Sequence, residues 1–185
     1  MKRLILLTLI FTSVNMFGQT LNVTPDGLKD TNDSQKTFVV INCEGKTAKE
    51  LYENSLKYIN KNYKSPEDVI KGKTENEYLK FITHSPNFLI VKNSGAKIII
   101  DANYTIELYF KDGKVKFEII ELDMHAPNGG YKVVFTGGPF DGYPIYNKKG
   151  ELKRPETKTE IETFFNAQIN LIAEFLKGSA NQDNW

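Results

Sequence analysis

The chain contains two histidines, and one of them lies near a carboxylate in a pattern that could bind a metal ion. Asp123 and His125 are separated by one residue, and side chains at that spacing share one face of a strand. His84, or Asp141 from a glycine-rich stretch, could supply a third ligand. A catalytic zinc ion needs about three protein ligands and an open coordination position. The pattern therefore allows a metal-assisted hydrolase, although such a pair without a surrounding motif is more often a strand end that faces solvent.

Motifs of other catalytic classes are absent from the sequence. There is no Gly-x-Ser-x-Gly elbow of the serine hydrolases, and Ser85, which follows His84, precedes a proline that favours a turn. Gly137-Gly138-Pro139 lacks the Gly-Lys-Ser/Thr ending of a phosphate-binding loop. Cys43 is the only cysteine, and a lone cysteine in a strand is usually a small buried side chain. We therefore expect a protein that is not an enzyme and has no cofactor.

Aromatic residues gather in a stretch rich in glycine and proline at residues 135–146. Aromatic side chains in surface loops are common contact residues of binding sites. We therefore predict a binding surface for a protein or ligand, made by Phe135, Phe140, Tyr143 and Tyr146. The alternative is that these side chains fold back and cover the open edge of a sheet, which also needs protection.

A hairpin at residues 97–124 is the dominant structural pattern. From Ile98 to Phe110 every second residue is apolar and most residues between are polar, as in a strand with one buried face. Asp112-Gly113 follows and favours a two-residue type I′ turn. The turn predicts a register that places Val115, Phe117 and Ile119 opposite Phe110, Leu108 and Ile106.

The apolar alternation of the return strand changes parity after Ile119. A shift of one residue would turn the rest of the strand inside out, so we predict a β-bulge at Ile119–Ile120. The bulge would return Leu122 and Met124 to the core, near Tyr104 and Ala102. Alternatively, Ile120 covers the outer face of the sheet.

Two amphipathic helices are predicted on either side of this hairpin. Thr47 and Glu50 form a capping box, and apolar residues at helical spacing follow until about Lys64. Ser65-Pro66 should then open a further short turn. The second helix is expected to start after Pro155 with a capping box at Thr157 and Glu160, and to end at Gly178.

Several shorter segments have strand patterns. Residues 37–43 are apolar on both faces and predict a strand inside the sheet, and residues 77–84, 88–91 and 131–135 predict three more. The order of strand, helix, strands and helix indicates an α+β fold. In this fold a curved antiparallel sheet carries two main helices on one face.

Composition and charge limit the class of protein. The chain has 185 residues, 40% hydrophobic and 25% charged, which suits one globular domain at residues 37–178. Residues 1–18 are typical of a secretory signal peptide, residues 19–36 of a flexible leader, and residues 179–185 of a loose tail. Removing the signal peptide with Lys2 and Arg3 leaves 22 basic against 23 acidic residues, a net charge of −1.

This balance and the signal peptide predict where the protein acts and with what. A nearly neutral chain lacks the overall charge that binding to nucleic acid or an anionic membrane requires. No cysteine lies near the predicted cleavage site, so we expect no lipid anchor. We therefore expect an exported protein of the periplasm or the extracellular space, with an unidentified envelope protein or ligand as its partner.

Three segments of the chain resemble an exported domain-of-unknown-function family, number four-four-six-eight in words, whose members occur in Gram-negative envelope and secreted proteins. The segments are FVVINC, KTAKELYENSLKYINKNYKSPEDVI and IIIDANYTIELYFKDGKVKFEIIEL, within residues 37–124. The resemblance implies a fold similar to the TATA-binding protein, with a curved antiparallel sheet and helices on one side. It implies no activity, cofactor or catalytic residue, and the likeness to a DNA-binding fold does not imply DNA binding.

Together these observations favour an exported, non-enzymatic domain that binds a protein or ligand through residues 135–146. Two alternatives stay open from the sequence. One is a metal-assisted hydrolase that uses Asp123, His125 and His84. The other is an exported immunity or inhibitor protein.

Overall fold

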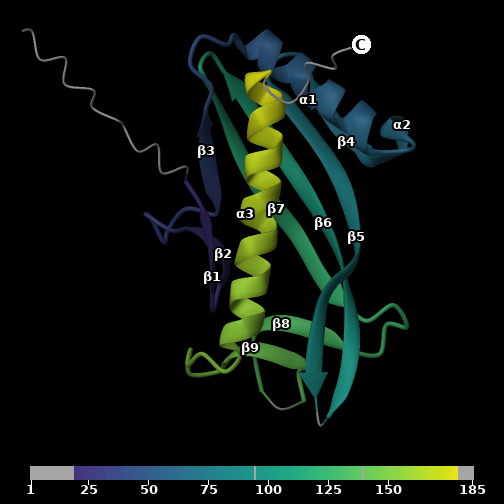
Figure 1. The fold of residues 1–185 in the computed structure, drawn as a ribbon. Coiled ribbons are helices and arrows are strands. Elements are labelled where there is room, and N and C mark those ends of the chain that lie inside the picture. Colours follow the sequence, from purple (N-terminus) through teal and green to yellow (C-terminus); the bar gives the residue numbers. More distant parts are fainter. Residues whose placement is uncertain (1–18, 94, 139, 179–185) are drawn as a thin grey trace, which may run out of the picture.

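A computed structural model describes residues 19–93, 95–138 and 140–178 (Figure 1). The predicted signal peptide at residues 1–18 and the predicted tail at residues 179–185 lie outside the described residues. The strands are β1 (Leu21–Thr24), β2 (Gly27–Asp30), β3 (Phe38–Asn42), β4 (Ile70–Thr74), β5 (Tyr78–Asn93), β6 (Ala96–Lys111), β7 (Lys114–His125), β8 (Lys132–Gly137) and β9 (Tyr143–Asn147). The helices are α1 (Ala48–Asn62), α2 (Pro66–Val69) and α3 (Pro155–Lys177).

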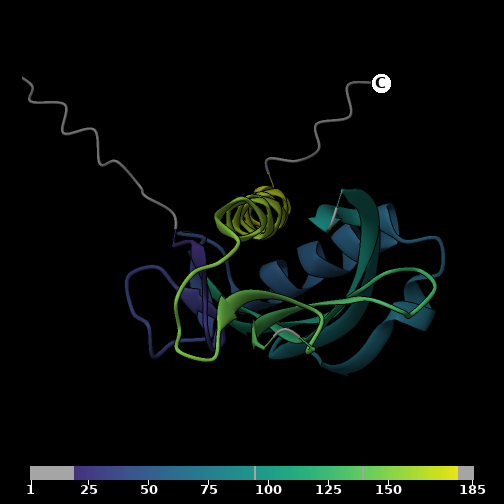
Figure 2. The same ribbon diagram turned by 90° about the horizontal axis from the view of Figure 1, so that it is seen from below.

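One large, mostly antiparallel sheet carries the two long helices on one face, so the predicted α+β class is confirmed (Figures 1 and 2). Its strand order is β4-β5-β6-β7-β8-β9, with β3 beside β7. The last pair, β8 and β9, is parallel, which the sequence pattern did not predict. β3 pairs with β7 alone, so the expectation that it lies inside the sheet is wrong. A strand with two apolar faces need not have a paired strand on each side, because helices and the second sheet can cover the faces of an edge strand.

The hairpin of β6 and β7 forms the centre of the sheet with the predicted register. Phe110, Leu108 and Ile106 pair with Val115, Phe117 and Ile119. The alternating apolar residues on one face of the hairpin, at every second position from Ile100 to Phe110 and from Val115 to Ile119, are buried in the core. The alternation of apolar and polar residues, together with the Asp-Gly turn, was therefore sufficient to predict this register.

The predicted β-bulge exists, but its position at Ile119–Ile120 is wrong. Those two residues pair regularly with Ile106 and Thr105, and the register shifts at the next position, where Tyr104 faces both Glu121 and Leu122. Met124 then pairs with Ala102 in the core, as predicted. Ile120 is half-buried on the outer face, so the strand changes face two residues later than its apolar pattern indicates.

The β5 strand joins two predicted strands into one. It pairs with β6 along almost its whole length, and its register shifts between Ser85 and Leu89, around Pro86. Proline lacks an N–H donor for a strand ladder, so an irregularity at this position is expected. β4, which the sequence did not indicate, pairs with the beginning of β5.

Residues 19–36, predicted as a flexible leader, instead contain the antiparallel pair of β1 and β2. Leu21, Val23 and Leu28 are buried in the common core. The side chain of Asn166 on α3 accepts a hydrogen bond from the Leu21 N–H at 2.8 Å and donates one to the Leu21 carbonyl at 3.0 Å. The many polar residues of this segment serve turns and these backbone contacts, so its composition alone was misleading.

Both long helices begin and end for identifiable reasons. The capping box of Thr47 and Glu50 at the start of α1 is confirmed. The predicted capping box of Thr157 and Glu160 is wrong, because α3 already begins at Pro155 and Thr157 is buried within the first turn. Proline is favoured at the first position of a helix, and here it sets the start. Gly178 ends α3 in a left-handed conformation, as predicted. Neither long helix in the described part of the chain has the length and apolar character of a membrane span.

Three tyrosines in the core predict a loss of stability at alkaline pH. Burial raises the pKa of Tyr104 to about 12, and it also raises the pKa of Tyr58 and Tyr63. Tyrosines of the unfolded chain ionise near pH 10. The contribution of these neutral hydroxyls to the free energy of unfolding is therefore fully present below pH 10 and is lost as the pH rises through 12. For Tyr104 alone this contribution is about 2–3 kcal/mol.

Denaturant unfolding between pH 8 and pH 12 measures this effect. We expect the free energy of unfolding to fall steeply above pH 10. The variant Tyr104→Phe should show a smaller fall, since it lacks one of the buried ionisable groups. An equal fall in the variant and the wild type would contradict this role of Tyr104.

Candidate functional site

The residues of the alternative metal site do not come together as a set of ligands. His84 Nδ1 is 2.8 Å from Asn103 Oδ1, while Asp123 contacts His125 Nδ1 and Lys132 Nζ, each at 3.2 Å. In the described part of the chain, no three His, Cys, Asp or Glu residues are grouped so that they could hold a metal ion. Asp141, the other suggested ligand, forms an ion pair with Lys148 at 3.4 Å. This arrangement does not provide the ligands that the hydrolase alternative requires.

The four predicted contact residues divide into two pairs. Phe135 on β8 packs against the core, and Tyr146 on β9 is 8% exposed and donates a hydrogen bond to the carbonyl of Val23 at 2.8 Å. Phe140 is 99% exposed, and Tyr143 on β9 is 7% exposed. Phe140 and Tyr143 line the cavity described next, whereas Phe135 and Tyr146 are not among its lining residues.

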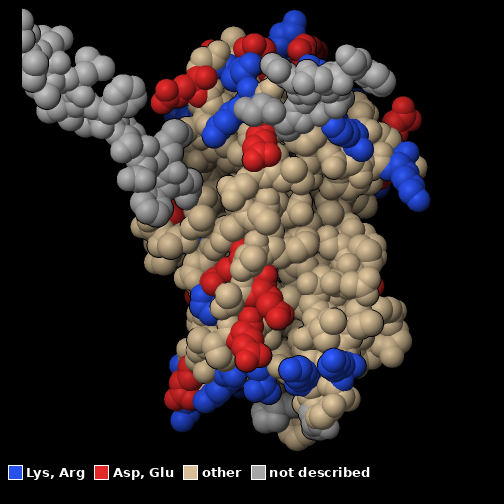
Figure 3. Space-filling model, in the orientation of Figure 1, with Lys and Arg blue, Asp and Glu red and all other residues tan. Residues whose placement is uncertain are grey.

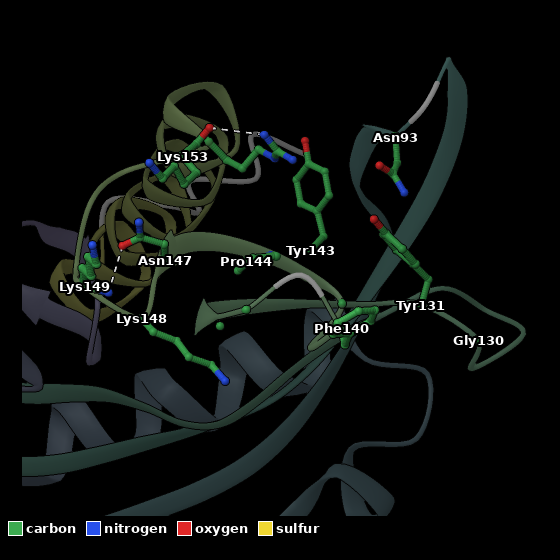
Figure 4. Close-up of a pocket in the computed structure, with 14 residues that line it drawn as sticks. Asn93, Gly130, Tyr131, Phe140, Tyr143, Pro144, Asn147, Lys148, Lys149 and Lys153 are labelled. Carbon is green, nitrogen blue, oxygen red and sulfur yellow. Dashed lines mark hydrogen bonds between the residues drawn. The ribbon is translucent and has the colours of Figure 1, made fainter.

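This cavity has a volume of about 860 Å³ and lies at the end of the molecule formed by β8, β9 and the start of α3 (Figure 4). Pockets for small organic molecules are typically about 300–1,000 Å³. We call it the basic pocket. Its lining residues are Asn93, Gly130, Tyr131, Gly137, Gly138, Phe140, Gly142, Tyr143, Pro144, Asn147, Lys148, Lys149, Lys153 and Arg154.

Glycine allows the chain to turn from β8 into β9 at this pocket. Gly142 has a φ of +102°, and a Cβ atom on it would lie 2.5 Å from the carbonyl oxygen of Lys132. No other residue fits there without a backbone shift. The N–H of Gly138 donates a hydrogen bond of 2.7 Å to the Asp141 carboxylate, which closes the connecting loop.

A second turn brings the basic residues alongside β9. The side-chain oxygen of Asn147 accepts hydrogen bonds from the N–H groups of Lys149 and Glu151, at 2.9 and 3.0 Å. The N–H groups of Lys153 and Arg154 both donate to the carbonyl of Ile145, at 2.8 and 3.2 Å. These bonds fix the backbone from which the cationic side chains extend.

Arg154 is held over an aromatic ring. Its guanidinium carbon is 4.6 Å from the ring centre of Tyr143, and this ring contacts that of Tyr131 at 6.2 Å between centroids. One guanidinium nitrogen donates to the carbonyl of Lys153 at 3.4 Å. No ion pair joins Arg154 to a carboxylate in the described part of the chain. The planar fork of donors that recognises carboxylates and phosphates is therefore available.

The pocket lining carries positive charge without a lining carboxylate. Asp141 and Glu151 lie next to the pocket and pair with Lys148 and Lys153, at 3.4 and 2.9 Å. Hydrogen bonds from Gly138 and Lys148 lower the pKa of Asp141, and a bond from Lys153 lowers that of Glu151. Both carboxyl groups therefore stay ionised at neutral pH and offset two of the four cationic charges.

The charge of the molecule is unevenly distributed, although its total is nearly neutral. Figure 3 shows basic side chains gathered at the lower end of the view, where β8, β9 and the start of α3 lie, and acidic side chains over the lower half of α3. Four of the seven residues from Lys148 to Arg154 are basic. This local group of basic residues was the signal in the sequence that could have indicated the pocket. The net charge of the whole chain does not reveal it, because acidic residues elsewhere balance it.

Comparisons with known proteins agree with the fold. Residues 38–124 match the model of a family described as "Domain of unknown function (DUF4468) with TBP-like fold". The crystal structure of a DUF4468 family protein from Bacteroides ovatus is similar to this chain, with a TM-score of 0.54 and 15% identity over 80% of this chain and 87% of that one. A TBP-like protein from Parabacteroides distasonis has a TM-score of 0.48 and 15% identity, over 78% of this chain and 91% of that one. No curated protein matches the sequence.

The matched residues contain the central hairpin, α1 and the strands beside it, and their fold is the one that the resemblance implied. Apart from Asn93, every residue that lines the basic pocket lies beyond the matched segment. Residues 38–124 of the chain therefore match the DUF4468 family, which is described as a domain of unknown function with a TBP-like fold.

Proposed function

We propose that this protein is an exported, non-enzymatic binding protein whose basic pocket takes an anionic organic group, either of a free molecule or of a partner. The observation that carries the proposal is the guanidinium of Arg154, stacked on Tyr143 without a carboxylate partner in the described part of the chain. Stacking restrains the side chain before a ligand arrives, so less entropy is lost on binding. Export itself is supported by the signal-peptide pattern of residues 1–18.

The composition of the pocket favours a ligand with two features. Arg154 and Lys149 are not ion-paired to any described carboxylate, and they would contact a carboxylate or phosphate group. Tyr131, Tyr143 and the exposed ring of Phe140 would contact a ring or another apolar body attached to it. Phenyl phosphate combines both features and is therefore a suitable probe.

Replacing Arg154 by glutamine should weaken the binding of phenyl phosphate by about 10- to 100-fold, because a hydrogen bond to a charged group contributes about 1.5–3 kcal/mol. Isothermal titration at low ionic strength measures the change. Lys149→Gln should weaken binding less, since lysine offers a single mobile charge.

Lys64→Gln is the matched control, because Lys64 is an exposed lysine that lies outside the pocket. It should bind the probe like the wild type, and the thermal unfolding of all variants should remain similar. Equal affinity of Arg154→Gln and the wild type would refute the proposed site.

A further inference from the structure

A second hollow, of about 450 Å³, lies where β5, β6 and β7 run side by side, and it shares no lining residue with the basic pocket. We call it the Glu121 hollow. Its lining residues are Tyr63, Val69, Ile82, Thr83, His84, Asn103, Tyr104, Thr105 and Glu121. Its volume is sufficient for a small organic molecule.

The β-bulge of the central hairpin places Glu121 at this hollow. Glu121 has a φ of +54°, in the left-handed region, where a residue with a side chain is uncommon and strained. A regular strand would have no such residue. Bulges commonly change the direction of one side chain next to a site, and strained residues concentrate at sites that use them.

A buried hydroxyl contacts the exposed carboxylate of Glu121. Thr105, which is only 2% exposed, donates a hydrogen bond of 2.8 Å to Glu121 Oε2. Glu121 forms no ion pair with any described residue. Its second carboxylate oxygen, Oε1, can therefore accept a hydrogen bond from a ligand.

The remaining lining determines the sign and shape of that ligand. Neither lysine nor arginine lines the hollow in the described part of the chain, so Glu121 provides its only permanent charge. His84 is held through Nδ1 by Asn103 Oδ1 at 2.8 Å. The aliphatic residues Val69 and Ile82 supply apolar surface. The exposed carboxylate of Glu121, beside the apolar surface of Val69, Ile82 and the tyrosine rings, complements one positive charge on an apolar body.

We propose that the Glu121 hollow binds a small organic cation, an ammonium group on a short apolar chain. The ammonium would donate to Glu121 Oε1, and its chain would cover the apolar lining. This site is independent of the basic pocket, because the two have opposite charge and no residue in common.

Titration of the full chain with n-butylammonium, followed by amide chemical shifts, tests the proposal. We expect saturable shifts at Glu121, Thr105 and His84. The variant Glu121→Gln keeps the length of the side chain and should weaken binding by about tenfold or more. Glu53→Gln, which alters an exposed glutamate of α1, should bind like the wild type.

Two further probes and one further variant separate the possible outcomes. Butyrate should cause no saturable shift in the hollow, and n-butanol should bind at least several-fold more weakly than n-butylammonium. Equal binding of n-butanol and n-butylammonium, or no effect of Glu121→Gln in a folded variant, would overturn the proposal. Arg154→Gln should leave ammonium binding unchanged, so failure of the basic pocket and failure of this hollow are distinguishable.

Discussion

Replacing Phe165 by alanine is expected to lower the free energy of unfolding by about 3–5 kcal/mol. Phe165 on α3 is fully buried, and its ring packs against Phe88, Tyr104 and Phe164 at centroid distances of 5.6, 5.2 and 5.2 Å. These contacts join α3 to β5 and β6. The loss combines the transfer energy of the ring and the cavity that remains.

Urea unfolding followed by circular dichroism measures the change. Leu171→Ala on the same helix is the matched control, since Leu171 is exposed and should cost much less. A loss below about 1 kcal/mol for Phe165→Ala would show that α3 does not form part of the core as described.

Replacing Val23 by aspartate should lower the free energy of unfolding by about 3 kcal/mol or more, because the substitution buries a charge that has no partner. Val23 on β1 is fully buried, and its carbonyl accepts the hydrogen bond from Tyr146. In a flexible leader the same substitution would have almost no effect. The free energy of unfolding therefore distinguishes the two descriptions of residues 19–36.

A neighbouring substitution provides the control for charge. Asn22→Asp introduces the same group one residue earlier, where the Asn22 side chain contacts Lys158 Nζ at 2.6 Å. The new carboxylate would lie beside a cation, so stability should stay within about 0.5–1 kcal/mol of the wild type. Equal losses of unfolding free energy for both variants would contradict the assignment of Val23 to the buried face of β1 and Asn22 to the opposite face.

The parts of the fold that the sequence predicted are those determined by local chemistry. Alternation from Ile98 to Phe110 and the Asp112-Gly113 turn specify the central register without reference to the rest of the chain. The capping box at Thr47 and the glycine at 178 likewise act within a few residues. Such signals are readable because each one restricts the backbone directly.

The features that the sequence did not predict depend on contacts between distant residues. The β1–β2 pair is held by Asn166 and Tyr146, more than 100 positions away in the chain, and its own composition resembles that of a loop. At the bulge, Thr105 on the neighbouring strand donates a hydrogen bond to the carboxylate of Glu121. Apolar periodicity alone detects the change of face but not this polar contact.

The candidate site also depends on contacts between distant residues, which the sequence did not predict. The aromatic stretch indicated the correct region, but the roles of its residues depend on the parallel pairing of β8 and β9, which buries Tyr146 and brings Tyr143 under Arg154. The basic run at residues 148–154 was visible in the sequence. Its position beside the aromatic rings follows from the hydrogen bonds of residues 153 and 154 to Ile145.

Binding of an anionic organic group in the basic pocket is tested most directly by mapping amide chemical shifts with phenyl phosphate. The structure predicts saturable shifts at Tyr131, Tyr143 and residues 147–154, and the loss of those shifts in Arg154→Gln. Saturable shifts centred on another part of the molecule, or no saturable shifts at millimolar phenyl phosphate and low ionic strength, would contradict it.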